Sequence, residues 1–67
     1  MILLTINGEN RSIEDPVTIA QFLEYRGLNP QVVVVEHNRE IVSRDRYGEI
    51  RLQAGDTLEI VQMMAGG

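Results

Sequence analysis

Hydrophobic and polar residues alternate at the start of the chain. Ile2, Leu4 and Ile6 are apolar, and the residues between them would point to the opposite face of a strand. This period of two predicts a β-strand with one buried face. Asn7-Gly8 follows, and both residue types tolerate the positive φ that a two-residue hairpin turn needs. We therefore expect an antiparallel hairpin whose second strand runs over residues 10–14.

The apolar spacing then changes to that of a helix. Thr18 is a good N-cap, and Gln21 three residues later completes a capping box. Gly27 suits the left-handed position that ends a helix. These signals predict one helix over residues 19–26. Its buried face would consist of three residues at helical spacing: Ile19, Phe22 and Leu23.

The second half of the chain has the pattern of strands joined by turns. Residues 32–35 are four valines in a row, which indicates a strand covered on both faces and central in a sheet. A short edge strand is expected over residues 40–42, and Tyr47 should anchor the irregular segment after it. Ala54-Gly55-Asp56 predicts a tight turn, and the last strand is expected over residues 57–62.

The order of these elements predicts an α+β fold. A helix between a hairpin and a further strand must cross one face of a mixed sheet, and the right-handed rule for such crossovers leaves few arrangements. We expect the last strand to lie beside the first, at the centre of a sheet of four to five strands packed on one helix. Residues 1–63 would form this domain, and residues 64–67 a flexible tail leaving the last strand.

Composition narrows the functional classes. The chain has 67 residues, is 43% hydrophobic and contains no cysteine, which suits one small core and excludes disulfides and thiolate nucleophiles. His37 is the single histidine, so no metal site is expected. We also expect it to lie in a turn without a catalytic role, because the local sequence offers no carboxylate or thiol partner.

Charge and hydrophobic runs bear on partners and location. The net charge of −4 disfavours nucleic acid and points toward a basic partner surface. The longest apolar run is the four valines, which is too short to span a membrane, and nothing at Met1 resembles a signal peptide. The expected location is therefore the cytoplasm.

The sequence ends in two glycines, Gly66 and Gly67. Without Cβ atoms they fit where a side chain would clash, and a terminal carboxylate with an ordinary pKa of about 3.5 is ionised at pH 7. Such a carboxylate can attack an activated phosphate in a partner's cleft. Residues 64–67 reach about 13–14 Å when extended, so Ala65 and Gly66 could thread into a pocket. For the glycine pair alone, a frayed terminus is the alternative.

The residues before the diglycine predict a partner interface. Val61, Met63 and Met64 form an apolar approach, and methionine suits surfaces that meet several partners. Leu3 should belong to the same exposed patch, and Glu59 should face outward to pair with an arginine of the partner. The alternative is that one of the methionines closes the core.

A family likeness extends over the whole chain, and it is carried by short matches in almost every element. These are Asn7-Gly8-Glu9, Thr18-Ile19, Phe22-Leu23, Val33–Val35, Asn38, Glu40-Ile41-Val42, Arg44, Leu52-x-x-Gly55-Asp56-x-Leu58-Glu59-Ile60-Val61 and Gly66-Gly67. With them the chain resembles the ThiS family of thiamine-biosynthesis sulfur carriers, which have a ubiquitin-like β-grasp fold. Two departures are Arg39, where a glycine is common, and Met63-Met64 before the diglycine.

The resemblance implies a carrier and not an enzyme, with Gly67 as the modified residue. An E1-like adenylating enzyme, using ATP and Mg, would attach AMP to the Gly67 carboxylate. Sulfur mobilised by a cysteine desulfurase would replace AMP and leave a thiocarboxylate, which would donate its sulfur to thiazole synthase. The resemblance implies no bound cofactor, no catalytic residue and a monomeric free state.

Three other functions remain open at this point. The first is a MoaD-type small subunit of molybdopterin synthase, although such chains are usually longer in the middle. The second is a ubiquitin-like protein modifier: the lack of lysine excludes chains of itself but not attachment to other proteins. The third is a β-grasp binding module whose diglycine is incidental.

Overall fold

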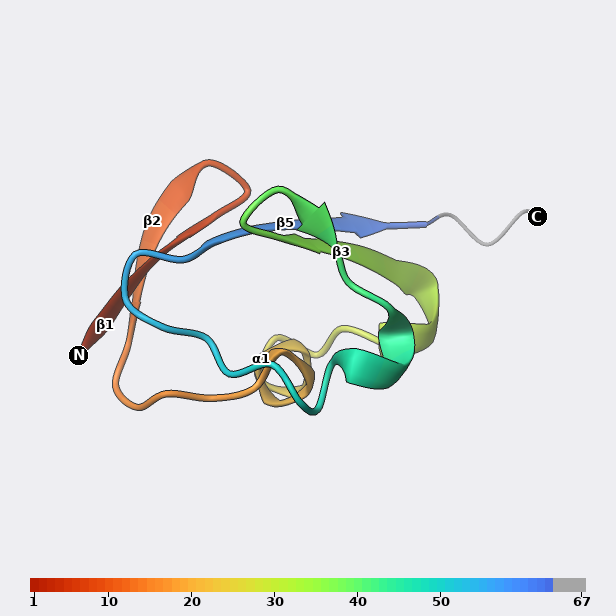
Figure 1. The fold of residues 1–67 in the computed structure, drawn as a ribbon, viewed down its shortest axis with the longest axis horizontal. Helices are drawn as coiled ribbons and strands as arrows, with labels where there is room; N and C mark the ends of the chain where they lie inside the picture. Colours follow the sequence, from red (N-terminus) through yellow and green to blue (C-terminus); the bar gives the residue numbers. More distant parts are fainter. Residues whose placement is uncertain (64–67) are drawn as a thin grey trace.

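The computed structural model describes residues 1–63, so the predicted tail of residues 64–67 lies outside the described part of the chain. The elements are β1 (Ile2–Ile6), β2 (Glu9–Ile13), α1 (Ile19–Tyr25), the 3-10 turn η1 (Pro30–Val32), β3 (Val33–His37), β4 (Glu40–Ile41), the 3-10 turn η2 (Arg44–Arg46) and β5 (Thr57–Gln62). Within residues 1–63 the strands form one five-stranded sheet in the order β2-β1-β5-β3-β4. Helix α1 and the segment of residues 42–56 lie on the same side of this sheet (Figure 1).

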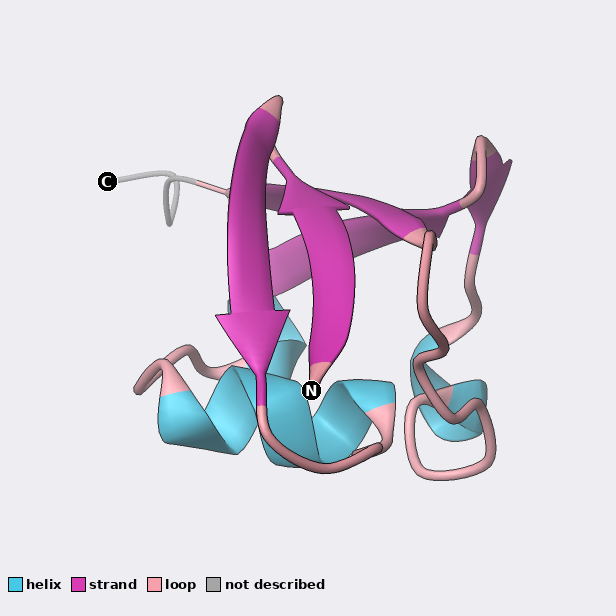
Figure 2. Cartoon of the chain, turned by 90° about the vertical axis from the view of Figure 1, so that its left-hand side faces the viewer, coloured by secondary structure: helices cyan, strands magenta, loops and turns pink. Residues whose placement is uncertain are grey.

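Strand β5 occupies the centre of the sheet, as the sequence predicts. It runs parallel to β1, with Thr57 beside Thr5 and Leu58 beside Ile6. On its other side it pairs antiparallel with the whole of β3. Figure 2 shows the sheet above the helix. We call the side of the sheet turned away from α1 the outer face.

The turn and cap signals of the sequence are confirmed. Asn7 and Gly8 have φ of +51° and +82°, as a two-residue hairpin turn requires, and β2 begins and ends one residue earlier than expected. Thr18 and Gln21 form the capping box at the start of α1. Gly27 has φ of +70°, one residue after the cap that ends the helix.

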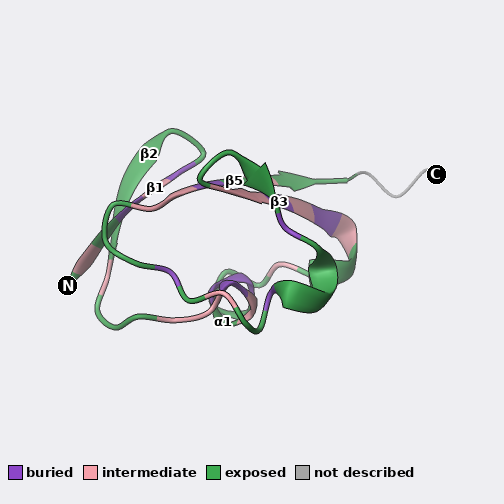
Figure 3. Cartoon of the chain, in the orientation of Figure 1, coloured by how far each residue is buried: buried purple, intermediate pink, exposed green. Residues whose placement is uncertain are grey.

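The interpretation of the valine run as a strand covered on both faces is wrong. Val33 and Val35 are fully buried, whereas Val32 and Val34 are only half-buried. The strand is interior in the sheet, yet within the described residues only the face toward α1 is covered (Figure 3). The β-branched side chains favour the extended backbone on either face, so a run of them does not prove double burial.

The core lies between the sheet and α1, and it includes the segment that connects β4 to β5. Its buried members are Leu4, Ile6, Ile19, Phe22, Leu23, Val33, Val35, Val42, Tyr47, Leu52 and Leu58. Tyr47 anchors the irregular segment as expected: its ring is buried, and its hydroxyl donates to the Val33 carbonyl oxygen at 3.4 Å. None of the helices described within residues 1–63 is long and apolar enough to cross a membrane.

Candidate functional site

Strand β5 leads toward the diglycine, and its last residues are fixed from both sides. On the β3 side, the Met63 N–H donates to the Val32 carbonyl oxygen at 2.6 Å. On the other side, β1 has already ended at Ile6. The side chain of Asn7 takes its place: Oδ1 accepts the Ile60 N–H at 2.7 Å, and Nδ2 donates to the Ile60 carbonyl oxygen at 3.3 Å. The chain is therefore held extended up to the point where the candidate tail begins.

The predicted interface residues of this strand are exposed. Val61 is 61% exposed and Met63 is 45% exposed, and Glu59 is also exposed. Side chains alternate along a strand, so Glu59 and Val61 lie on the outer face, opposite the buried Leu58. Met63 thus does not close the core. Met64, the second predicted methionine, lies outside the described residues.

Leu3 is exposed on the same outer face, but the structure does not bring it together with Val61. The Leu3 carbonyl oxygen accepts the Gly55 N–H, so Leu3 lies beside the start of β5. Val61 is six residues further along, which corresponds to about 20 Å of strand. The polar pair Thr5 and Thr57 lies between them. The single patch expected from the sequence is two separate ones.

The residues predicted to carry or guide the modification, Ala65, Gly66 and Gly67, lie outside the described residues. What the structure adds is the strand that precedes them in the chain. Strand β5 is hydrogen-bonded to β3 along its length, and it ends at an exposed apolar segment. The candidate site is therefore the end of a central strand that carries exposed apolar side chains directly before the predicted tail.

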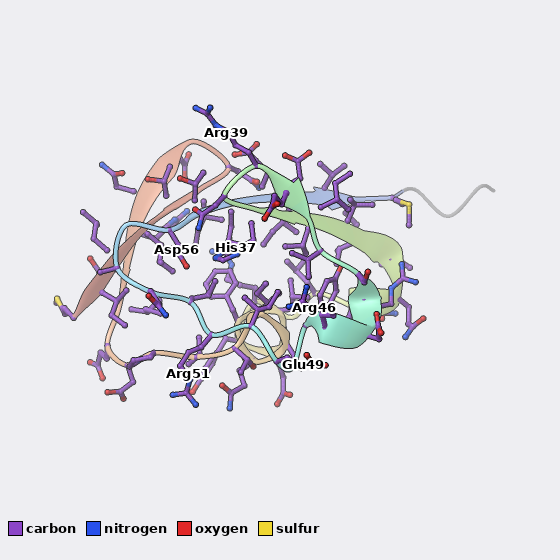
Figure 4. All side chains as sticks on the ribbon, viewed as in Figure 1. His37, Arg39, Arg46, Glu49, Arg51 and Asp56 are labelled. Carbon is purple, nitrogen blue, oxygen red and sulfur yellow. The ribbon has the colours of Figure 1, made fainter. Side chains whose placement is uncertain are left out.

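A polar cluster that the sequence analysis missed fixes the beginning of this strand. His37 Nε2 lies 2.7 Å from Asp56 Oδ2, and Figure 4 shows the two side chains side by side between the sheet and the returning segment. Asp56 also accepts the Gln53 N–H at 2.9 Å and the Asn38 Nδ2 at 3.2 Å. The Asn38 Oδ1 in turn accepts the Thr57 N–H at 2.9 Å.

The cluster changes the titration of its carboxyl group. Burial alone raises the pKa of Asp56, but hydrogen bonds from His37, the Gln53 backbone and Asn38, together with the charge of His37, outweigh burial and leave the pKa lowered. The expectation that His37 lies in a turn is wrong, because it is the last residue of β3, and it gains from a distant segment the carboxylate partner that its local sequence was expected to lack. The partner is 19 residues away in the sequence, and only the pairing of β3 with β5 brings it close.

The cluster is suited to holding structure. Its carboxylate and amide groups are all engaged with the turn or with the start of β5, so none is aimed at an open site. Across residues 1–63, no group of three or more histidine, aspartate or glutamate side chains gathers as a set of metal ligands.

Comparisons with known proteins agree with this architecture. The family model described as the ThiS family matches residues 4–67. The sulfur carrier protein ThiS of Bacillus subtilis strain 168 is 36% identical over 66 residues, which cover 97% of this chain and all of that protein. The crystal structure of the thiamine biosynthesis protein ThiS from Geobacter metallireducens superposes with a TM-score of 0.85 at 25% identity, covering 98% of this chain and all of that one.

Longer relatives also match. A thiazole synthase of Paramagnetospirillum magneticum strain AMB-1 is 39% identical over 64 residues, which cover 96% of this chain. The chain spans 20% of the length of that protein. A segment similar to this chain is thus part of a larger protein in that bacterium.

The fold and these matches define the class first: a ubiquitin-like β-grasp protein of the sulfur-carrier kind. The chain belongs to the ThiS family, the sulfur carriers of thiamine biosynthesis.

Proposed function

We propose that this chain carries sulfur on the carboxyl group of Gly67 for the formation of the thiazole ring of thiamine. The observation that carries the proposal is the family match, which extends through Gly66 and Gly67 and joins them to a β-grasp body. Membership of the family favours this function over a molybdopterin-synthase subunit, a protein modifier or a simple binding module.

The chemistry takes place in three steps, and other proteins catalyse each of them. The Gly67 carboxylate attacks the α-phosphorus of ATP, with Mg bound to the nucleotide, on an E1-like adenylating enzyme. This step forms an acyl-adenylate and releases pyrophosphate. The terminal sulfur of a persulfide formed by a cysteine desulfurase then attacks the carbonyl carbon and displaces AMP. A thiol cleaves the resulting acyl disulfide, which leaves a thiocarboxylate and a new disulfide. Thiazole synthase receives that sulfur. We propose the cytoplasm as the location.

The structure supports a carrier in two ways. Strand β5 brings the chain to the tail in an extended form that a narrow cleft can accept, because Asn7 and β3 hold its end. The apolar side chains of Val61 and Met63 are exposed next to the tail, where a partner must hold the protein. The carrier itself needs no active site, because the activating and receiving partners supply the reactive groups.

The match with a thiazole synthase supports the choice of sulfur acceptor. A segment similar to this chain makes up a fifth of a protein named thiazole synthase, and a sulfur donor joined to its acceptor in one polypeptide would have a high local concentration.

Intact-mass measurement of the purified protein tests the proposal. Incubation with the adenylating enzyme, ATP, Mg, the desulfurase and cysteine should shift the mass by the difference between one sulfur and one oxygen. The same incubation without ATP should leave the mass unchanged. A complete mixture that yields neither pyrophosphate nor the shifted mass would remove the proposed function.

A further inference from the structure

Strand β2 forms one edge of the sheet, and among the strands described in residues 1–63 its only neighbour is β1. The Thr5 N–H donates to a backbone oxygen on the β5 side. Backbone groups alternate in direction along a strand, so the neighbouring Leu4 bonds to its β2 partner Arg11. By the same alternation, the backbone groups of Asn10 and Ser12 point away from β1. Unpaired donors and acceptors on such an edge are a template for a further strand.

A groove of about 440 Å³ lies next to this edge, between β2, α1 and the connection of residues 14–17. In Figure 1 the connection leaves β2 and passes below the sheet to reach α1. The least exposed of the lining residues are apolar: Phe22 is 5% exposed, and Ile13 and Val17 are half-buried. The ring of Tyr25, which is 80% exposed, also lines the groove. The groove therefore offers an apolar floor directly beside unpaired backbone groups.

Charged side chains on the walls of the groove limit what can occupy it. The guanidinium carbon of Arg26 lies 5.7 Å from the centre of the Phe22 ring, which holds the cation over the floor. None of the ion pairs described within residues 1–63 includes Arg26. Glu14 and Asp15 line the groove from the connection and would repel a run of carboxylates. The walls therefore suit an occupant with a single acidic side chain among apolar ones.

We propose that β2 and this groove bind an extended segment of a partner protein. The segment adds a strand to the free edge of β2, where its backbone bonds to that of Asn10 and Ser12. Side chains alternate along the added strand, so every second one enters the groove. Apolar side chains cover the floor, and one acidic side chain pairs with Arg26. In such strand addition the backbone bonds supply affinity and the side-chain positions supply specificity.

A second copy of this chain fits the groove poorly. Leu4 and Ile6 are buried on the helix side of the sheet, and their β2 partners Arg11 and Glu9 share that side. Two β2 edges paired with each other would therefore place charged side chains over the apolar floor. A different protein that contributes apolar residues at alternate positions covers the floor without this cost.

The position of the groove leaves the end of β5 accessible. Strand β1 separates β2 from β5, and Figure 1 places β2 and the end of β5 at opposite sides of the molecule. A segment bound at β2 would hold this protein without covering the residues that lead to the C-terminus. The inference is thus independent of the proposed sulfur transfer, and the failure of either leaves the other standing.

The test titrates the full-length, isotope-labelled protein with a capped peptide, Thr-Val-Thr-Val-Thr-Asp-Thr, whose valines and aspartate share one face. Amide NMR signals of β2 and of residues 22–26 should shift together and give one Kd. Ser12→Pro removes an outward N–H at a position where an edge strand tolerates proline, and it should raise Kd about fivefold, the effect of one hydrogen bond. Ser12→Ala keeps the N–H and should leave Kd unchanged.

A second pair of variants tests the charge. Arg26→Gln should raise Kd about tenfold for the aspartate peptide, because a charge-assisted bond is lost. It should leave Kd unchanged for a peptide with threonine in place of aspartate. Arg51→Gln removes an exposed arginine outside the groove and should change neither value.

Melting temperatures show whether each variant is folded, and a modified peptide replaces Ser12→Pro if that variant is not. Methylation of every second backbone nitrogen removes the peptide donors on one edge only. Strand addition therefore requires that methylation on one edge abolishes binding and methylation on the other does not. Absence of peptide binding, shifts confined to the outer face, equal Kd for folded Ser12→Pro and Ser12→Ala, or binding of both methylated peptides overturns the proposal. So do β2 signals that shift with protein concentration alone, which would identify a second copy as the occupant.

Discussion

Asn7 combines two roles at the end of β1. Its backbone has φ of +51°, which asparagine tolerates better than most residues, and its side-chain amide bonds both the N–H and the carbonyl oxygen of Ile60. A side chain therefore replaces the strand that β5 loses where β1 ends. This keeps β5 in register with its neighbours as it approaches the tail.

Replacement of Asn7 should loosen the end of β5. Asn7→Gly keeps the turn conformation and removes only the amide, so the free energy of unfolding should fall by about 1–2 kcal/mol. Amide hydrogen exchange at Ile60 should accelerate. Asn7→Asp keeps an acceptor for the Ile60 N–H, so its free energy of unfolding should lie between those of the unsubstituted protein and Asn7→Gly. Unchanged exchange at Ile60 in Asn7→Gly would contradict this role.

The lowered pKa of Asp56 makes stability depend on pH. A carboxyl group whose pKa is lower in the folded state stabilises the protein at any pH above the pKa that the group has in the unfolded state, which is 3.8 for Asp56. That stabilisation is lost as the pH falls through the pKa of the folded state. Urea unfolding between pH 6 and pH 2 should therefore show that the free energy of unfolding falls in the acid range. The Asp56→Asn variant should lack this fall. Parallel pH curves for the two proteins would exclude the cluster as its source.

These two residues also mark where prediction from sequence stopped. The sequence identified Asn7 as a turn residue and Asp56 as part of a turn, and both are confirmed. The partners of their side chains, Ile60 and His37, lie 53 and 19 residues away in the sequence. No pattern in the neighbouring sequence indicates either contact. Only the register of β5 against its two neighbours reveals them.

The C-terminal end of α1 is stabilised by a Schellman motif. The Leu28 N–H donates to the Leu23 carbonyl oxygen at 2.9 Å, and the Gly27 N–H donates to the Glu24 carbonyl oxygen at 3.0 Å. Both bonds require Gly27 in the left-handed region, at φ of +70°. The motif turns Leu28 back toward the core, where it is half-buried.

Gly27→Ala should destabilise the protein by about 1 kcal/mol, the usual cost of a left-handed non-glycine residue, or roughly 4–8 °C in melting temperature. Gly48→Ala is a matched control. A Cβ at either position meets nothing within 4 Å, and Gly48 is not among the glycines with positive φ. Only the backbone angle distinguishes the two. Equal melting temperatures for both variants would contradict this explanation.

At the scale of elements, strong local signals in the sequence predicted the helix and the strands well. The hydrophobic pattern did not predict which strand faces are buried. The hairpin, the capped helix and β5 lie where turn chemistry and periodicity place them, with the helix ending at Tyr25 instead of Arg26. The valine run predicted a strand but not how its faces are covered. Residue type sets the preference for a strand, whereas the arrangement of the other elements decides whether a second face is buried.

For the molecule as a whole, the core and the candidate reactive end belong to different parts of the chain. The buried core residues are all found between Leu4 and Leu58. The sequence predicted correctly that Val61 and Met63 are exposed, but it wrongly placed Leu3 in the same patch. The alternation of apolar and polar residues shows to which face of the sheet a side chain points. It does not show which residue of a neighbouring strand lies beside it. The roles assigned to Met64, Ala65, Gly66 and Gly67 remain predictions.

Removal of Gly66 and Gly67 should therefore separate folding from function. Because the described core is complete by Leu58, the free energy of unfolding of the shortened protein should differ from that of the full chain by less than about 0.5 kcal/mol. Changes at the surface usually have effects of this size. It should still bind the adenylating enzyme, yet release no pyrophosphate and gain no sulfur. Addition of one alanine after Gly67 should have the same effect, since it moves the carboxylate while keeping both glycines. A shortened protein that still acquires sulfur would show that the carrier group lies elsewhere in the chain.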